Sequence, residues 1–182
     1  MKQFALPTLC DLAHASKATR KIFWQHDGLH FYLTLLEDVY WQAPALESIV
    51  VWLQDETARV ESVLLQPDSI RAMVTCFNSG KGISFENMLE PLVKISRQSF
   101  KLAISLSEQP SFLHKLADRL AHPKALVRLN LLRIVRVFCE VSPSPDAVLR
   151  RERLVEVSIA CECECKFTGF TCLSRLFRSL AL

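Results

Sequence analysis

Apolar residues recur at spacings of three and four along most of the chain, which is the pattern of helices with one buried face. Strand-like alternation is hard to find, and only four glycines occur in 182 residues. An α/β enzyme needs more glycines than this for its tight turns and phosphate loops. The sequence therefore predicts an all-α fold. The predicted buried stripes are Leu29, Tyr32, Leu33 and Leu36; Leu46, Ile49, Val50 and Leu53; Ile70, Met73, Val74 and Phe77; Phe112, Leu113, Leu116 and Leu120; and Leu126, Leu129, Leu132, Val135 and Val137 or Phe138.

The predicted helices recur in a fixed order, with a shorter helix before a longer helical run. Residues 43–65 and 85–107 each read as one such long run. The shorter helices start at 29, 70 and 112, and the longer ones near 6, 46, 89 and 126, so the spacings lie between 37 and 43 residues. A period near 40 in an all-helical chain is typical of armadillo or HEAT repeats. The alternative is an irregular helical bundle, but "QPDSI" and "QPSF" before successive units favour a repeat.

This period predicts an armadillo/HEAT-like solenoid of about three and a half repeats over residues 1–155. A divergent, cysteine-containing tail over 156–182 follows, and its last residues can form one amphipathic helix. Three local signals fix the expected helix starts. Gly28 follows the turn "QHDG", Pro44 suits a first turn, and Asp68 or Ser69 suits an N-cap.

Composition narrows the class of protein further. Half of the residues are hydrophobic and 23% are charged, which indicates one folded domain. A net charge of +3 is too small for a dedicated nucleic-acid binder, so we expect no nucleic-acid partner. No apolar run is long enough for a membrane span, and the N-terminal segment lacks the apolar core of a signal peptide. We therefore expect a cytoplasmic or nuclear protein with no membrane partner. Cys10, Cys76 and Cys139 lie in helical patterns and are predicted to be small buried residues.

Four blocks carry a family resemblance: "ALPTLCDLAHASKATR" (5–20), "GLHFYLTLLEDVYWQAPALESIVVWLQDETARVESVLLQPDSI" (28–70), "FENMLEPLVKIS" (85–96) and "LAHPKALVRLNLLRIVRVFCEVSP" (120–143). They resemble the armadillo-like C-terminal region of the fungal septation-initiation serine/threonine kinases, which plant MAP kinase kinase kinase epsilon shares. "WLQDETARVE" and "HPKALVRLNLLR" are the most specific blocks.

The resemblance implies a region of a kinase that acts in septation or mitotic exit. Family members carry a kinase domain, sit at the spindle pole body and are recruited there by a Ras-like GTPase, while this region serves localisation and partner binding. We therefore expect a Ras-like small GTPase or a spindle-pole scaffold as partner.

The chain itself contains none of the motifs of a kinase catalytic domain. "NSGKGIS" lacks the spacing of a phosphate-binding loop and reads as a loop between helices. His26 and His30 have metal-ligand spacing, but Gly28 between them indicates a turn. Asp11, His14 and Ser16 lack the further group that a nucleophile system needs. We expect no catalytic, cofactor or metal site.

Function should then reside in the surface of the longer helices, which line the concave groove of an armadillo stack. Asn130 is unusual inside a leucine-rich helix, and it either bonds a ligand's main chain or bonds a neighbouring loop. Basic residues around it could form a patch for an acidic or phosphorylated partner, the alternative being a solvated face. Tryptophans in such a protein more often belong to the core or to a groove wall than to a hot spot. The predicted partner-binding residues are Trp52, Arg97, Arg119, Lys124, Arg128, Asn130 and Arg133, with Asp11, His14, Glu47 and Lys94 as further groove positions.

"IACECECKF" (159–167) is the most conspicuous stretch of the tail. Together with Cys172, its three cysteines supply the four thiolates of a tetrahedral zinc site. Their C-x-C-x-C spacing differs from the C-x₂-C pairs of zinc modules, so we interpret them as incidental thiols.

Two hypotheses on function stay open. In the first, the chain is a non-catalytic interaction and localisation module, whose binding to a GTP-loaded Ras-like protein is lost when Arg128 and Arg133 become Glu. In the second, it is part of an ATP-dependent kinase whose catalytic domain lies outside this chain.

Overall fold

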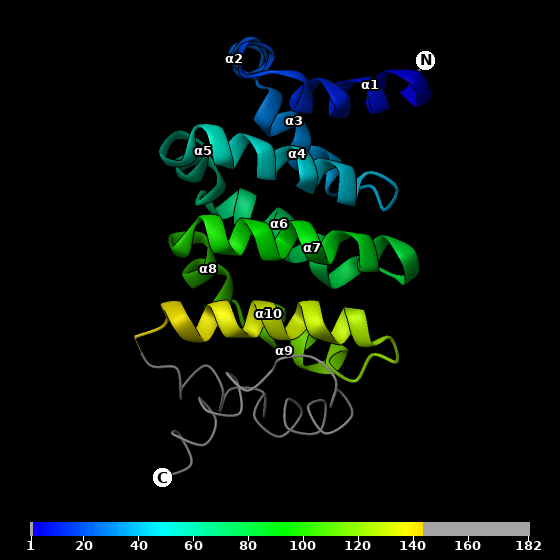
Figure 1. Ribbon diagram of the computed structural model, residues 1–182, viewed down its shortest axis with the longest axis vertical. Helices are drawn as coiled ribbons and strands as arrows, with labels where there is room; N and C mark the ends of the chain where they lie inside the picture. Colours follow the sequence, from blue (N-terminus) through cyan, green and yellow to red (C-terminus); the bar gives the residue numbers. More distant parts are fainter. Residues whose placement is uncertain (1, 144–182) are drawn as a thin grey trace. The chain divides into compact units, whose positions relative to one another are not determined.

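The computed structural model describes residues 2–143, and within them the side chains from residue 5 onward. These residues form α-helices and no strand, so the all-α prediction is confirmed for the described part of the chain (Figure 1). None of these helices is long and apolar enough to cross a membrane. The helices are α1 (Lys2–Ala15), α2 (Lys17–Gln25), α3 (Gly28–Leu35), α4 (Gln42–Asp55), α5 (Thr57–Leu64), α6 (Pro67–Ser79), α7 (Gly82–Gln98), α8 (Phe100–Ser107), α9 (Pro110–Arg119) and α10 (Ala125–Val141).

The helices recur in groups of three, in which the third is the longest. In α2–α3–α4 the lengths are 9, 8 and 14 residues. In α5–α6–α7 they are 8, 13 and 17, and in α8–α9–α10 they are 8, 10 and 17. The long helices α4, α7 and α10 begin at residues 42, 82 and 125, so the predicted period near 40 residues is present in the helix starts.

The chain divides into two compact units, 1–106 and 107–182. In the first unit α1, α4 and α7 lie side by side, with α3 and α6 packed behind them (Figure 1). The second unit contains α9 and α10 in its described part. The predicted boundary between residues 155 and 156 lies outside the described residues, as does the tail with its four cysteines.

The two predicted long runs are each broken into two helices, which corrects the sequence interpretation. Glu56 (φ −133°, ψ 54°) separates α4 from α5, and Ser99 (φ −131°, ψ 101°) separates α7 from α8. The Ser99 hydroxyl accepts a hydrogen bond from the Leu102 N–H at 3.1 Å. An N-cap bond of this kind satisfies a donor of the new helix and competes with continuation of the old one.

Two local predictions also need correction. The N-cap of α6 is Gln66, because Pro67 occupies the first helical position, where its fixed φ suits the helix and no N–H is needed. In the predicted α10 stripe, Leu126 is 68% exposed and Leu129 is half-buried instead of buried. The buried stripe of α10 runs through Val127, Leu131, Ile134 and Phe138, and Leu126 lies one position ahead of it.

The four other predicted stripes are buried throughout, so the core prediction holds in helices α3, α4, α6 and α9. Cys10, Cys76 and Cys139 are buried, as predicted, and form no disulfide among the described residues. Burial, with a smaller contribution from the Glu140 carboxylate, raises the pKa of Cys139 to about 11. This cysteine therefore stays a neutral thiol at physiological pH.

Glu61 links α5 to α8 and provides a testable pH dependence. Its carboxylate accepts hydrogen bonds from the Ser99 hydroxyl at 2.6 Å and the Lys101 ammonium at 2.9 Å, and both lower its pKa below the ordinary value of 4.5. A depressed pKa contributes stability that is present above the unfolded-state pKa and is lost as the pH falls through the folded-state value.

We expect Glu61→Gln to lower Tm by roughly 2–4 °C at pH 7, as loss of about 1 kcal/mol would. This Tm difference should shrink as the pH falls below 4.5 and through the lowered pKa of Glu61. Thermal unfolding followed by circular dichroism, from pH 7 into the acid range, measures it. Glu37→Gln, at an exposed carboxylate, is the control. A Tm difference that does not change with pH would show that the charged network is not its cause.

Candidate protein-binding surface

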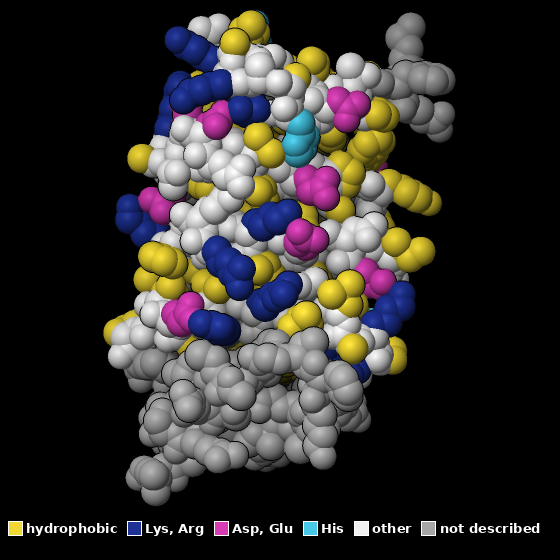
Figure 2. Space-filling model, viewed as in Figure 1, with side chains coloured by type: hydrophobic (Ala, Val, Ile, Leu, Met, Phe, Trp, Pro, Cys, Tyr) yellow, Lys and Arg dark blue, Asp and Glu magenta, His cyan; other side chains and the backbone are white. Residues whose placement is uncertain are grey.

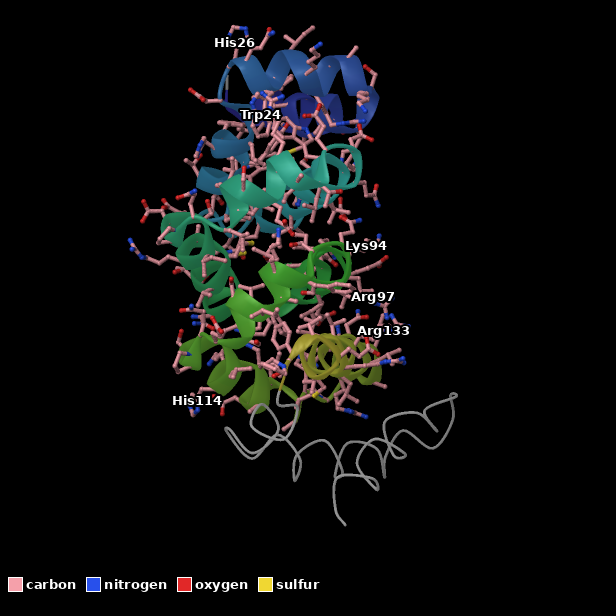
Figure 3. The ribbon with its side chains drawn as sticks, turned by 90° about the vertical axis from the view of Figure 1, so that its left-hand side faces the viewer. Trp24, His26, Lys94, Arg97, His114 and Arg133 are labelled. Atoms are coloured by element: carbon pink, nitrogen blue, oxygen red, sulfur yellow. The ribbon has the colours of Figure 1, made fainter. Side chains whose placement is uncertain are left out.

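The exposed side of α7 carries two of the predicted groove positions. Glu90, Lys94 and Arg97 follow one another at spacings of four and three, and therefore share a polar stripe opposite the buried residues of the helix. Lys94 forms an ion pair with Glu90 at 2.9 Å. Arg97 has no ion-pair partner among the described residues. Figure 3 shows the Lys94 and Arg97 side chains extending from α7 toward solvent.

A hollow of about 450 Å³ opens between α1 and α4 in the first unit. Helical spacing brings its lining residues onto facing sides of the two helices, because positions three or four apart share a face. The turn before α4 is held by Gln42, a fully buried residue whose side-chain amide donates to the Leu36 carbonyl at 3.1 Å. This bond fixes Trp41 at the edge of the hollow. The lining residues are Pro7, Cys10, Asp11 and His14 from α1, and Trp41, Pro44 and Glu47 from the start of α4.

Two carboxylates give this hollow a negative charge. The pKa of the Cys10 thiol is raised first by burial and then by the nearby charges of Asp11 and Glu47, against a lowering by a hydrogen bond with Ser48. The charges of both carboxylates therefore reach the Cys10 thiol. Neither has an ion-pair partner in the part of the chain that the structure describes. In Figure 2 acidic and histidine side chains lie over α1 and α4, and Lys and Arg side chains lie over α7.

Trp52, a predicted partner-binding residue, belongs to the core. Its side chain is 2% exposed, with ring centroids 5.8 Å from those of Tyr32 and Trp24. The Tyr32 ring is edge-on to it, and the Tyr32 hydroxyl donates to the Leu9 carbonyl at 2.6 Å. This position removes Trp52 from the accessible surface and corrects its assignment as a groove residue.

Arg128 and Asn130 are also buried, at 8% and 7% exposure. The Arg128 guanidinium donates to the carbonyls of His122 and Pro123, each at 2.8 Å, and so holds the loop between α9 and α10. The Asn130 side-chain oxygen accepts from Arg133 at 3.1 Å, on the same helix. Among the described residues, Asn130 bonds no neighbouring loop, and that it bonds a ligand's main chain stays a prediction.

The remaining predicted basic residues differ in accessibility. Lys124 is exposed at the N-cap of α10, whereas Arg119 and Arg133 are half-buried. The six basic and amide positions therefore do not form one equally exposed patch. That any of them binds a partner stays a prediction.

The structure also places the residues that were considered as metal ligands, as a nucleophile or as a phosphate-binding loop. His26 and His30 are both exposed, with Asp27 between them in a left-handed conformation (φ 54°). Ser16 caps α2 by accepting from the Thr19 N–H at 3.1 Å. Among residues 2–143 no group of three histidine, cysteine or acidic side chains is placed to hold a metal ion. Lys81 and Gly82 open α7 directly after Gly80, which ends α6.

The sequence missed the apolar walls of the hollow. The sequence marks Asp11, His14 and Glu47 as polar positions on long helices, but it does not connect Pro7, Trp41 and Pro44 with them. The sequence does contain a pattern for these walls. Residues 41, 44 and 47 are spaced by three, and residues 7, 11 and 14 of α1 are spaced by four and three, so each set lies on one face of its helix. Only the packing of α1 against α4 shows that the two sets face each other.

Comparison with known proteins finds relatives across most of the chain. The chain is 45% identical over 161 residues to cytokinesis protein sepH of Emericella nidulans, and the match covers 86% of this chain and 12% of that protein. Identity to MAP3K epsilon protein kinase 1 of Arabidopsis thaliana is 39% over 151 residues, or 82% and 11% of the two chains. Identity to cell division control protein 7 of Schizosaccharomyces pombe is 33% over 158 residues, or 86% and 15%.

The chain thus spans about 12% of the length of the curated relatives that it matches. No protein-family model and no solved structure matches it.

Proposed function

Because the chain belongs to the septation-related protein kinases, as one region of them, we propose that it is a non-catalytic interaction region of such a kinase. The names of its relatives connect the family with cytokinesis, cell division and protein kinases. The region's partner is a Ras-like small GTPase or a spindle-pole scaffold. Through this partner the region localises the kinase, and the kinase chemistry belongs to other parts of the polypeptide.

The proposed architecture is an armadillo/HEAT-like solenoid. Three successive groups of three helices, each ending in the longest one, support it. In such a repeat the third helix of each group lies next to the third helix of the following group, so their exposed sides form one surface. Within the first unit α1, α4 and α7 lie side by side in this way.

The observation that carries the proposal is the exposed side of these three helices in the first unit. It combines a hollow, lined by Asp11 of α1 and Glu47 of α4, with Arg97 of α7, and none of these three charges has an ion-pair partner within residues 5–143. Exposed charges without internal partners contribute little to stability, but they steer and orient a protein partner of complementary charge. The surface is therefore suited to recognising a protein.

We expect Arg97→Glu to weaken binding of a GTP-loaded Ras-like GTPase of the septation pathway by about tenfold, or about 1.4 kcal/mol. The reason is that a negative charge replaces the positive charge which faces an acidic surface of the partner. Isothermal titration calorimetry with the 182-residue chain measures Kd at fixed ionic strength, because such charges are screened by salt.

Arg71→Glu on α6 is the matched control, since it makes the same charge change at an exposed site that lies on none of the long helices. Its Kd should stay within about twofold of the parent value. Equal weakening by both variants would reveal a general charge effect. No binding of any GTPase or scaffold by the parent chain would refute the proposed function.

A further inference from the structure

The hollow between α1 and α4 has a chemistry that the proposed function alone does not specify. We propose that it binds the arginine or lysine side chain of an extended segment in a protein partner, with Asp11 and Glu47 as its charge partners. The inference rests on the proposed interaction function and names the chemical class that this site recognises.

The charge of the hollow is the first argument. Asp11 lies on α1 and Glu47 on α4, and both line the same cavity. Neither carboxylate has an ion-pair partner among the described residues, whereas Asp55 in the same unit is paired with Arg20. A guanidinium or ammonium group that enters the hollow would therefore form charge-assisted hydrogen bonds that no internal group supplies.

The walls are the second argument. Pro7 and Pro44 give the hollow apolar sides, and half-buried Trp41 presents an indole ring. Apolar walls accommodate the methylene stem of a long basic side chain, while an aromatic ring attracts the cationic head through its electron-rich face. The volume of about 450 Å³ falls within the range of roughly 300–1,000 Å³ in which ligands bind.

The surroundings of the hollow favour a peptide segment over a small free cation. Next to α4 lies α7, whose exposed side carries Arg97, a cation with no ion-pair partner in the described part of the chain. A peptide segment that crosses from α1 to α7 passes the carboxylates of Asp11 and Glu47 first and the guanidinium of Arg97 second. A partner chain with a basic residue followed by an acidic one complements both, whereas a small polyamine would leave Arg97 unmatched.

The test uses the 182-residue chain and a peptide with blocked ends, in which an arginine is followed by an acidic residue. The two-dimensional NMR signals of the tryptophan indole N–H groups separate Trp41, which lines the hollow, from the core residue Trp52. We expect the Trp41 signal to shift on titration while that of Trp52 does not. Asp11→Asn combined with Glu47→Gln should weaken the peptide's Kd at least tenfold at 150 mM salt.

Glu37→Gln combined with Asp68→Asn is the matched control, because it removes the same two charges from exposed positions outside the hollow. Its Kd should stay within about twofold of the parent value. Equal weakening in both double variants, an unmoved Trp41 signal, or absence of binding would overturn the proposal. So would equally tight binding of spermine, which would identify a site for small cations.

A failure of this proposal can be distinguished from a failure of the proposed function. Peptide binding in the hollow without any GTPase or scaffold binding would count against the proposed partner only. A GTPase complex that depends on Arg97 but is unaffected by Asp11→Asn with Glu47→Gln would leave the proposed function standing and reject this inference.

Discussion

Replacing Trp52 by alanine should lower the free energy of unfolding by about 3–5 kcal/mol, the cost of removing a large buried aromatic side chain from a packed core. The indole contacts Tyr32 and Trp24 and is 2% exposed. Its removal leaves a cavity between α2, α3 and α4, because all three residues are on these helices. Urea unfolding followed by helical circular dichroism gives the value.

Trp52→Phe is the control that identifies packing as the cause. The buried Nε1–H of Trp52 finds no hydrogen-bond acceptor among the described residues, so the tryptophan carries the penalty of an unsatisfied donor. Phenylalanine keeps an aromatic ring and removes that donor. We expect it to cost no more than about 1 kcal/mol. If Trp52→Ala leaves stability unchanged but abolishes partner binding, the ring is a binding residue and not part of the core.

The sequence predicted the helices and most of the core because both depend on local periodicity. Tyr32 and Leu36, or Ile70 and Phe77, share a face of a helix wherever that helix packs, so their burial follows from spacing alone. The period near 40 residues was readable for the same reason. Leu126 was misassigned because the start of α10 decides which of two adjacent positions joins its stripe.

The breaks at Glu56 and Ser99 were not predicted, although Ser99 is a good N-cap residue. An apolar pattern that continues on both sides of a break gives the same signal as one long helix. The decision between them depends on long-range bonds, here the one from Ser99 to Glu61, which is 38 residues away. No local pattern contains that information.

The candidate site was predicted least well because polarity does not show which way a side chain points. Arg97 and Arg128 both read as basic positions on a long helix, yet the first is exposed and the second is buried against backbone carbonyls. The carbonyls that receive Arg128 belong to a loop whose path the sequence does not specify. Likewise, the facing of Asp11 and Glu47 requires the packing of α1 on α4.

Replacing Arg128 by methionine should lower the free energy of unfolding by about 2–3 kcal/mol. The Arg128 side chain donates two charge-assisted hydrogen bonds of 2.8 Å, to the carbonyls of His122 and Pro123. Bonds that involve a charged group contribute roughly 1.5–3 kcal/mol each, and exposure of the loop carbonyls to water offsets part of their loss. Methionine keeps the unbranched stem, so the change isolates the guanidinium from the packing. Urea unfolding measures this loss of free energy. Amide hydrogen exchange of residues 120–125 reports separately on the loop.

Arg133→Met is the matched control, because Arg133 lies on the same helix, is half-buried and donates a hydrogen bond of 3.1 Å to the Asn130 side-chain oxygen. We expect it to cost less than about 1 kcal/mol and to leave exchange in the α9–α10 loop unchanged. Arg128→Met should accelerate exchange there, since the loop loses the group that holds it. If Arg128→Met instead leaves stability and exchange unchanged while partner binding is lost, Arg128 contacts the partner, as its place in the basic sequence "RLNLLR" first suggested.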